Sequence, residues 1–172
     1  NCLGGMATKG LVGPFMTCYD RYGEQMIIKG IFGEIVDRLV EKNWAIHPEH
    51  VRWESPYTAW IKAGHDHVTP FDPEGLKVIL ETMCGEAGVK ILYHTNFVET
   101  IMNGNAAAGA VVLQKQGLRK IHARMVIDAT GDGDVAVSAG SPFSMGCKER
   151  DGKIQPASLF LRINNVDSKK LE

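Results

Sequence analysis

The strongest constraint on the fold is an ordered change of hydrophobic period in the second half of the sequence. Residues 72–88 carry apolar side chains at helical spacing, whereas apolar and polar side chains alternate beyond Gly88. Asn103-Gly104-Asn105 and Gln116-Gly117 interrupt the alternation with residues typical of hairpin turns. This order predicts a helix followed by a three-stranded meander, with strands over residues 97–102, 106–114 and 118–123.

Two further extended runs are predicted on either side of the meander. Val89, Ile91 and Tyr93 alternate with polar neighbours, and Met125-Val126-Ile127 is a short apolar run suited to a buried strand. That run leads into the turn Asp128-Ala129-Thr130-Gly131-Asp132-Gly133-Asp134. Gly131 lets a ligand approach the backbone, whose free amides can bind oxygen atoms. A ligand at the carboxyl end of a parallel strand is the expected arrangement in an open α/β sheet.

Two amphipathic helices are predicted, over residues 30–43 and residues 72–88. The second has Asp72 as its N-cap, Pro73 at its first helical position and Gly88 as its left-handed C-terminal cap. Its buried stripe is expected to comprise Leu76, Ile79, Leu80, Met83 and Ala87. A short helix over residues 135–139 and a last strand over residues 158–163 are also expected.

The first part of the sequence predicts less regular structure. Residues 3–14 are rich in glycine and small residues, which is typical of a ligand-binding loop. Residues 44–70 show no sustained period, so we expect short strands or an irregular excursion, with Trp53, Tyr57 and Trp60 near its middle. We interpret the histidines of this excursion as members of a solvated loop, because no cysteine partner or H-E-x-x-H helix accompanies them; they are His47, His50, His65 and His67, with Asp66 between the last two.

Composition disfavours several classes of partner. The net charge of -1, from 19 basic and 20 acidic residues, gives no basic face for nucleic acid and no polybasic patch for a membrane surface. No apolar run approaches the roughly 20 residues that span a bilayer, and no signal peptide pattern is present. The four cysteines, Cys2, Cys18, Cys84 and Cys147, form no C-x-x-C pair and are expected to be reduced. The cytoplasm is the expected compartment.

Several motifs occur together in an order that resembles the FAD-dependent oxidoreductase family related to fumarate reductase flavoproteins. The motifs are Leu3-Gly4-Gly5-Met6-Ala7-Thr8, Phe71-Asp72-Pro73-Glu74, Ala129-Thr130-Gly131-Asp132 and Gln155-Pro156-Ala157-Ser158-Leu159. The resemblance implies an α/β fold: a partial FAD/NAD(P)-binding Rossmann-like domain with a three-stranded β-meander, its first βαβ unit missing. It implies a partial FAD-binding domain over residues 1–145, with the excursion at 44–70 inside it, and a connector plus the first strand of a truncated substrate domain over residues 146–172.

The resemblance also implies which residues contact FAD. Gly4, Gly5, Met6, Ala7 and Thr8 would lie along the flavin and its ribityl chain, and Val98 would hold the adenine through backbone atoms. Ala129, Thr130, Gly131 and Asp132 would approach the ribose and pyrophosphate. The glycine loop and the Thr130-Gly131 corner are therefore expected to converge on one dinucleotide. The resemblance assigns no catalytic residue within the chain.

The sequence departs from the family's pattern in its glycine-rich phosphate loop. The first strand, the G-x-G-x-x-G turn and the ribose-binding acid are expected before Asn1, and the late catalytic segments beyond Glu172. FAD is the expected cofactor of the intact protein, which would oxidise or reduce a small-molecule substrate by hydride transfer, with an unknown electron acceptor. The chain alone is expected to bind FAD weakly or not at all and to be inactive, because it lacks the phosphate loop.

Two other interpretations remain open. The meander and the aromatic excursion could form a non-catalytic binding or oligomerisation module, because an open sheet edge favours self-association. Asp132 and Asp134, with Asp128 nearby, could bind Mg²⁺ for phosphoryl transfer. The spacing fits a calcium loop poorly, since Thr130 stands at the third position and Ala139 at the position of the bidentate glutamate, so no metal site is predicted.

Overall fold

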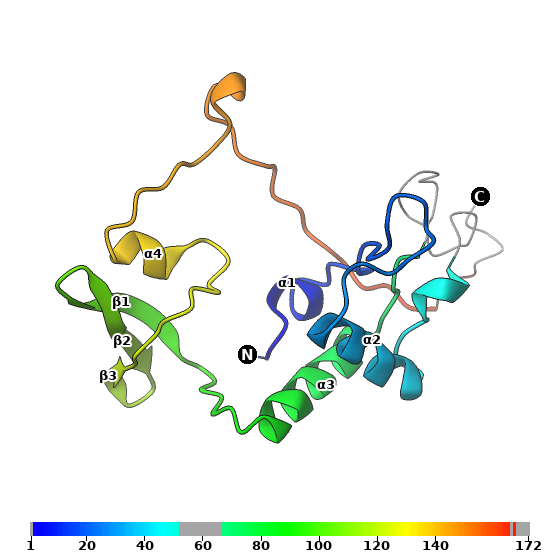
Figure 1. Ribbon diagram of the computed structural model, residues 1–172, viewed down its shortest axis with the longest axis horizontal. Helices are drawn as coiled ribbons and strands as arrows, with labels where there is room; N and C mark the ends of the chain where they lie inside the picture. Colours follow the sequence, from blue (N-terminus) through cyan, green and yellow to red (C-terminus); the bar gives the residue numbers. More distant parts are fainter. Residues whose placement is uncertain (1, 52–66, 166, 168–172) are drawn as a thin grey trace. The chain divides into compact units, whose positions relative to one another are not determined.

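The computed structural model describes residues 2–51, 67–165 and 167, which form two compact units. The helical unit comprises Cys2–Ile91 with Leu159–Glu172, and the sheet unit comprises Leu92–Ser158. Figure 1 shows helices α1 to α3 in the helical unit and the strands with α4 in the sheet unit. This mixed content confirms the α/β class, whereas the Rossmann arrangement stays a prediction.

The helical unit is built around two amphipathic helices, α2 (Ile31–Glu41) and α3 (Pro73–Glu86), which confirms both predicted long helices. They bury one face each, and their shared core consists of Leu39, Leu76 and Ile79, all at most 5% exposed. Burying an aliphatic side chain of this size stabilises a fold by about 1.5–3 kcal/mol. Of the stripe predicted for α3, Leu80 and Met83 are partly buried against this core, but Ala87 is exposed because the helix has ended there.

An arginine joins the outer surfaces of these two helices. The Arg38 guanidinium donates to both carboxylate oxygens of Glu86 on α3, at 3.0 and 2.6 Å, and to Glu34 one turn earlier on α2. The hydrogen bonds to Glu86 and then to Glu34 raise the pKa of Arg38, and the bond from Arg38 lowers the pKa of Glu86. Because both glutamates are exposed and Arg38 is only half-buried, we regard the cluster as fixing the orientation of the helices rather than as a major source of stability.

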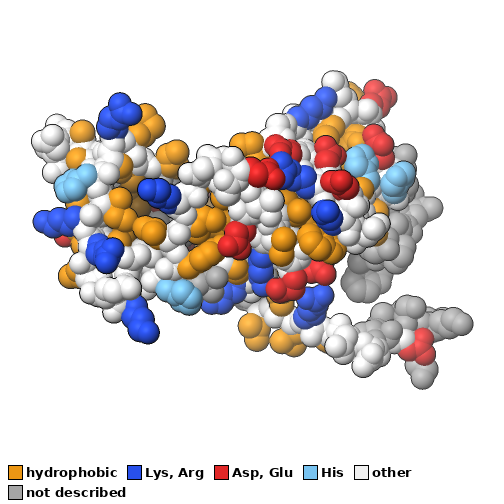
Figure 2. Space-filling view, turned by 90° about the horizontal axis from the view of Figure 1, so that it is seen from below, with side chains coloured by type: hydrophobic (Ala, Val, Ile, Leu, Met, Phe, Trp, Pro, Cys, Tyr) orange, Lys and Arg blue, Asp and Glu red, His pale blue; other side chains and the backbone are white. Residues whose placement is uncertain are grey.

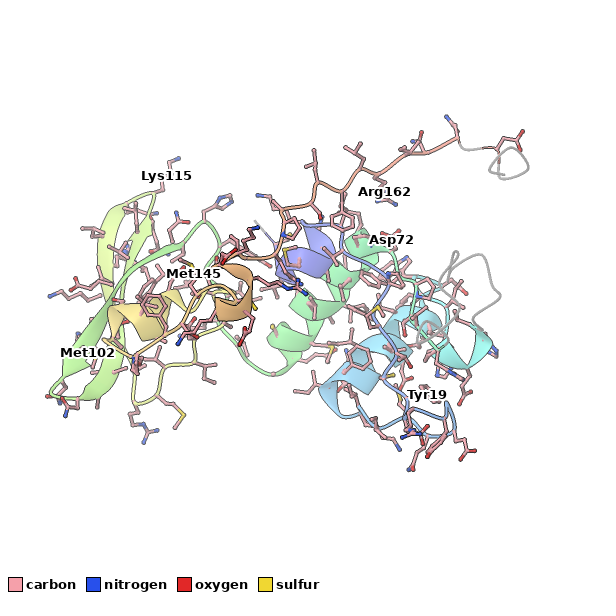
Figure 3. All side chains as sticks on the ribbon, turned by 90° about the horizontal axis from the view of Figure 1, so that it is seen from above. Tyr19, Asp72, Met102, Lys115, Met145 and Arg162 are labelled. Atoms are coloured by element: carbon pink, nitrogen blue, oxygen red, sulfur yellow. The ribbon has the colours of Figure 1, made fainter. Side chains whose placement is uncertain are left out.

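Both ends of α3 follow the sequence prediction. The Asp72 carboxylate accepts the Glu74 amide at 2.8 Å, Pro73 occupies the first turn, and Gly88 beyond the helix has φ 70°. Figure 3 shows Asp72 close to Arg162, whose guanidinium lies 4.0 Å from the second carboxylate oxygen.

The Asp72→Ala variant is expected to lower the free energy of unfolding by about 1 kcal/mol, because an amide of the first turn loses its acceptor. Asp72→Asn is the matched control, since it keeps the acceptor oxygen and should change stability by only a few tenths of a kcal/mol. Urea denaturation followed by tryptophan fluorescence measures both, because Trp44 packs against the core of the helical unit. Equal losses in the two variants would show that the charge, rather than the cap, stabilises the helix.

The predicted glycine loop is more structured than expected, whereas the described ends of the excursion at 44–70 contain only a short helix and isolated bridges. Residues Gly5–Thr8 form a short helix, α1, where the sequence predicts a loop throughout. A 3-10 helix follows α2 at Pro48–His50, and isolated bridges pair Phe15 with Thr69 and Ala45 with Phe71. The Phe15 and Phe71 rings stack with centroids 4.1 Å apart. Trp53, Tyr57, Trp60, His65 and Asp66 lie outside the described residues.

The sheet unit contains the predicted meander as an antiparallel sheet in the order β1-β2-β3. Its strands are β1 (Asn96–Asn103), β2 (Ala106–Gln114) and β3 (Gly117–His122), within a residue or two of the predicted bounds. Figure 3 shows Met102 near one end of the sheet and Lys115, in the β2–β3 turn, at the other. Helix α4 (Asp134–Ser138) lies against β1, where the Thr100 amide donates to the Ser138 hydroxyl and the Thr100 hydroxyl donates to the Val135 carbonyl, both at 2.8 Å.

Three of the predicted strands are wrong in the described part of the chain. Residues 89–93, 125–127 and 158–163 belong to no strand, and Met125 and Ile127 are 79% and 83% exposed. An apolar run becomes a strand only when a neighbour accepts its backbone hydrogen bonds, and no described segment pairs with these three.

Among the described residues, no helix is long and apolar enough to cross a membrane. Figure 2 shows hydrophobic side chains interspersed with charged ones on the surface of the chain. All four cysteines are free thiols, as the sequence predicts.

Candidate functional site

The turn at Gly4-Gly5, where α1 begins, has a backbone conformation that glycine adopts more readily than other residues. Gly4 and Gly5 have φ of 92° and 45°, and a Cβ at Gly4 would lie 2.5 Å from the Thr8 side chain. Gly4, Gly5 and Met6 are exposed, with Met6 at 68%. The exposed backbone of this turn is a surface that a ligand can reach.

The other two residues predicted for this part of the site face inward. Ala7 packs against the core of the helical unit, and Thr8 is 1% exposed, with its hydroxyl donating to the Leu3 carbonyl at 2.6 Å. The Thr8 side chain therefore holds the turn in shape. Any contact of Thr8 with a cofactor would have to come from its backbone.

The second predicted part of the site is the turn between β3 and α4, which is organised by Asp128. One oxygen of its carboxylate accepts the Thr130 amide at 3.0 Å and the Thr130 hydroxyl at 2.7 Å. The other oxygen accepts the Ala136 amide at 2.9 Å, and the Thr130 hydroxyl in turn accepts the Asp134 amide at 3.0 Å. These bonds, with the Ala136 amide as the largest contribution, lower the pKa of Asp128 below its usual range. Asp128 is therefore an anion at neutral pH.

The middle of this turn offers donors to a ligand. Within the described part of the chain, the amides of Gly131, Asp132 and Gly133 donate no hydrogen bond. Gly131 and Gly133 have φ of 94° and 75°, and a Cβ on either would meet nothing within 4 Å. Successive unpaired amides beside glycines that leave open space fit the oxygen atoms of a phosphate or a ribose. The residues of this turn therefore suit the ribose and pyrophosphate of FAD, which the resemblance implies for them.

Val98 lies in the same unit, at an irregularity of β1. The register passes from Phe97 opposite Val112 to Glu99 opposite Val111, so Val98 is an extra residue without a cross-strand partner. Val98 and Asp134 line one hollow of about 480 Å³, together with Phe97, Val137, Ser138 and Phe143. The bulge and the start of α4 are thus neighbours within the sheet unit. Gly4–Thr8 belong to the helical unit, so their convergence with this turn on one FAD stays a prediction.

The metal interpretation of the acidic turn gains no support. Among the described residues, no three histidine, cysteine or acidic side chains come together as metal ligands. Both oxygens of Asp128 already accept hydrogen bonds from the turn itself.

The histidine prediction is wrong for His67, which is 4% exposed rather than solvated. Its amide donates to the Val51 carbonyl at 2.8 Å, and its ring stacks on Tyr19 with centroids 4.3 Å apart. The Tyr19 hydroxyl lies 3.5 Å from a carboxylate oxygen of Glu49. His47 accepts the Glu49 amide, as expected for a local hydrogen bond.

Sequence reasoning placed Asp128 at the start of the turn and near the proposed Mg²⁺ ligands without assigning it a structural role, and it did not single out Tyr19. An aspartate two residues before a threonine is typical of a local side-chain-to-backbone turn, and this signal could have identified Asp128 as the organiser of the loop. No pattern in the sequence indicates the stacking of Tyr19 on His67, because that contact joins residues far apart in the chain.

Comparison with known proteins identifies the family. The sequence model of the FAD dependent oxidoreductase family matches residues 1–172. Comparisons with curated proteins and with solved structures find no significant match. Because the family match covers the whole sequence, this chain belongs to the FAD dependent oxidoreductase family, whose cofactor in the intact protein is FAD.

Proposed function

We propose that the intact protein oxidises or reduces a small organic substrate by hydride transfer between a substrate carbon and FAD. The observation that carries the proposal is the turn at Gly131–Gly133, whose amides have no partner in the described part of the chain. The chain belongs to a family that binds FAD, and these amides could bind its oxygen atoms. When bound, FAD supplies the hydride chemistry, and the protein binds, orients and shields it. A relation to fumarate reductase flavoproteins is the finer form of this proposal.

The described residues would contribute binding rather than catalysis. The unpaired amides of Gly131, Asp132 and Gly133 would donate to the pyrophosphate or ribose, and Val98 would present its bulged backbone to the adenine. The exposed backbone of Gly4, Gly5 and Met6 would border the flavin and its ribityl chain, with Ala7 and Thr8 holding that turn. No residue is proposed as the acid or base that handles the substrate proton.

The wider organisation belongs to the same proposal. Residues 1–145 would form the FAD-binding part and residues 146–172 a connector that leads into a substrate domain. Four free thiols are compatible with the cytoplasm as the compartment. The outer edge of β3 is a possible surface for self-association. The printed 172-residue sequence has no G-x-G-x-x-G turn, so we expect this chain alone to bind FAD weakly and to be inactive.

The proposal is tested with the protein expressed from its complete reading frame. We expect it to carry FAD, and we expect Gly131→Ala to weaken FAD binding about tenfold, or about 1.4 kcal/mol, because the new methyl group would face the cofactor. Fluorescence titration of the apoprotein with FAD measures the dissociation constant.

Gly140→Ala is the matched control for this variant. Gly140 also has positive φ, of 82°, is exposed, and would place a Cβ in open space, but it lies outside the proposed site. Both variants carry similar backbone strain, so only contact with FAD separates them. Equal effects of the two substitutions, or a wild-type protein that binds no FAD, would contradict the proposal.

A further inference from the structure

The Asp128 carboxylate occupies an unusual position for a family member that binds a doubly charged pyrophosphate. It stands at the start of the turn whose next amides are proposed to bind that anion. A negative charge near the phosphates opposes their binding. Asp128 is therefore unsuited to binding the pyrophosphate directly, and its place in the turn calls for another explanation.

The hydrogen bonds of Asp128 supply that explanation. Its carboxylate connects the two ends of the turn, since one oxygen holds Thr130 and the other holds Ala136, eight residues along the chain. The Thr130 hydroxyl extends this connection to the Asp134 amide. The amides of residues 131–133, which lie between Thr130 and Asp134, have no partner in the described chain. Charge-assisted hydrogen bonds of this kind are about twice as strong as neutral ones.

We propose that Asp128 is a positioning residue for FAD, which closes the turn from both ends and thereby directs the amides of Gly131, Asp132 and Gly133 toward the cofactor. This inference rests on the proposed function and deepens it. Asp128 acts by fixing the conformation of the turn, although its negative charge opposes the binding of the phosphates. Thr130 is its relay, because the hydroxyl donates to Asp128 and accepts from Asp134 at the same time.

The direction in which Asp128→Asn changes the affinity for FAD separates a geometric role of Asp128 from an electrostatic one. Asp128→Asn removes a negative charge near the phosphates, which by itself would tighten FAD binding. The amide also replaces one acceptor oxygen with an NH₂ group that faces a donor, which opens the turn. We expect the second effect to prevail, with an increase of about tenfold in the FAD dissociation constant of the full-length protein.

The experiment has two readouts, one of them independent of FAD. Hydrogen–deuterium exchange of the full-length apoprotein should show faster exchange of the amides of residues 128–136 in Asp128→Asn, with exchange in β2 unchanged. Fluorescence titration then gives the FAD dissociation constant. Asp151→Asn, which removes an exposed charge elsewhere in the sheet unit, is the control and should alter neither readout.

Thr130→Val provides a second test in case Asp128→Asn does not fold, because it removes the relay hydroxyl while keeping the side-chain shape. It should weaken FAD binding, and Thr130→Ser, which retains the hydroxyl, should bind FAD more tightly than Thr130→Val. Unchanged or tighter FAD binding by Asp128→Asn and Thr130→Val, in a wild-type protein that does bind FAD, overturns this inference alone. A wild-type protein without affinity for FAD overturns the proposed function as well, whereas the exchange result still reports whether Asp128 closes the turn.

Discussion

Leu39→Ala is expected to lower the free energy of unfolding of the helical unit by about 2–5 kcal/mol, a large share of the roughly 5–15 kcal/mol that stabilises a typical domain. Leu39 is 0% exposed and forms the core cluster of this unit with Leu76 and Ile79. Truncation removes apolar contacts from both helices and leaves a cavity between residues that cannot move together without breaking their own packing. The midpoint of urea denaturation, followed by tryptophan fluorescence, measures the loss.

The control for this prediction lies on the same helix. Ile31 has the same number of side-chain carbons as Leu39 but is 72% exposed, at the first turn of α2. Ile31→Ala should change stability by no more than about 0.5 kcal/mol. If the two variants lose the same stability, the core of the helical unit does not lie between α2 and α3, and the assignment of its buried face is wrong.

The helices could be predicted from the sequence because their signals are local. The hydrophobic period of residues 30–43 sets the buried face of α2, and Asp72 with Pro73 fixes the start of α3 within a single turn. Hairpin signals are local too, which explains why the turn at Gly104 and the three strands of the meander lie where the pattern predicts. Each of these features depends on residues a few positions apart.

The strands that were wrongly predicted depend on neighbouring strands that the alternating pattern does not identify. Residues 125–127 have the composition of a buried strand, yet Met125 and Ile127 are largely exposed, and no described segment pairs with this run. Residues 89–93 fail for the same reason. Alternation reports which side of a strand would be buried, and it carries no information on whether a neighbour is present.

The candidate site shows the same division between local and distant information. Ala129, Thr130, Gly131 and Asp132 could be located because small residues after an apolar run are a local pattern. The hydrogen bond from the Ala136 amide to Asp128, and the bulge at Val98, depend on the path of the folded backbone. The sequence therefore indicates where the turn is, whereas the structure is needed to show which hydrogen bonds hold it in shape.

The Gly109→Ala variant is expected to destabilise the sheet unit by about 2–4 kcal/mol, from overpacking together with backbone strain. Gly109 lies in the central strand, opposite Ile101 on β1 and His122 on β3, and has φ 153°. A Cβ at this position would collide with the Ile121 backbone carbonyl. Because the obstacle is backbone of a paired strand, it can move aside only if β3 separates from β2.

Hydrogen–deuterium exchange of residues 106–122 measures this effect, since the sheet unit contains no tryptophan. Gly117→Ala separates strain from collision, because Gly117 also has positive φ, of 104°, but a Cβ there would meet nothing within 4 Å. We expect Gly117→Ala to cost about 1 kcal/mol and to leave β2 and β3 protected, whereas Gly109→Ala should expose the amides of both strands. Equal protection in the two variants would mean that β3 does not pack against Gly109, and the register of β2 with β3 would have to be redrawn.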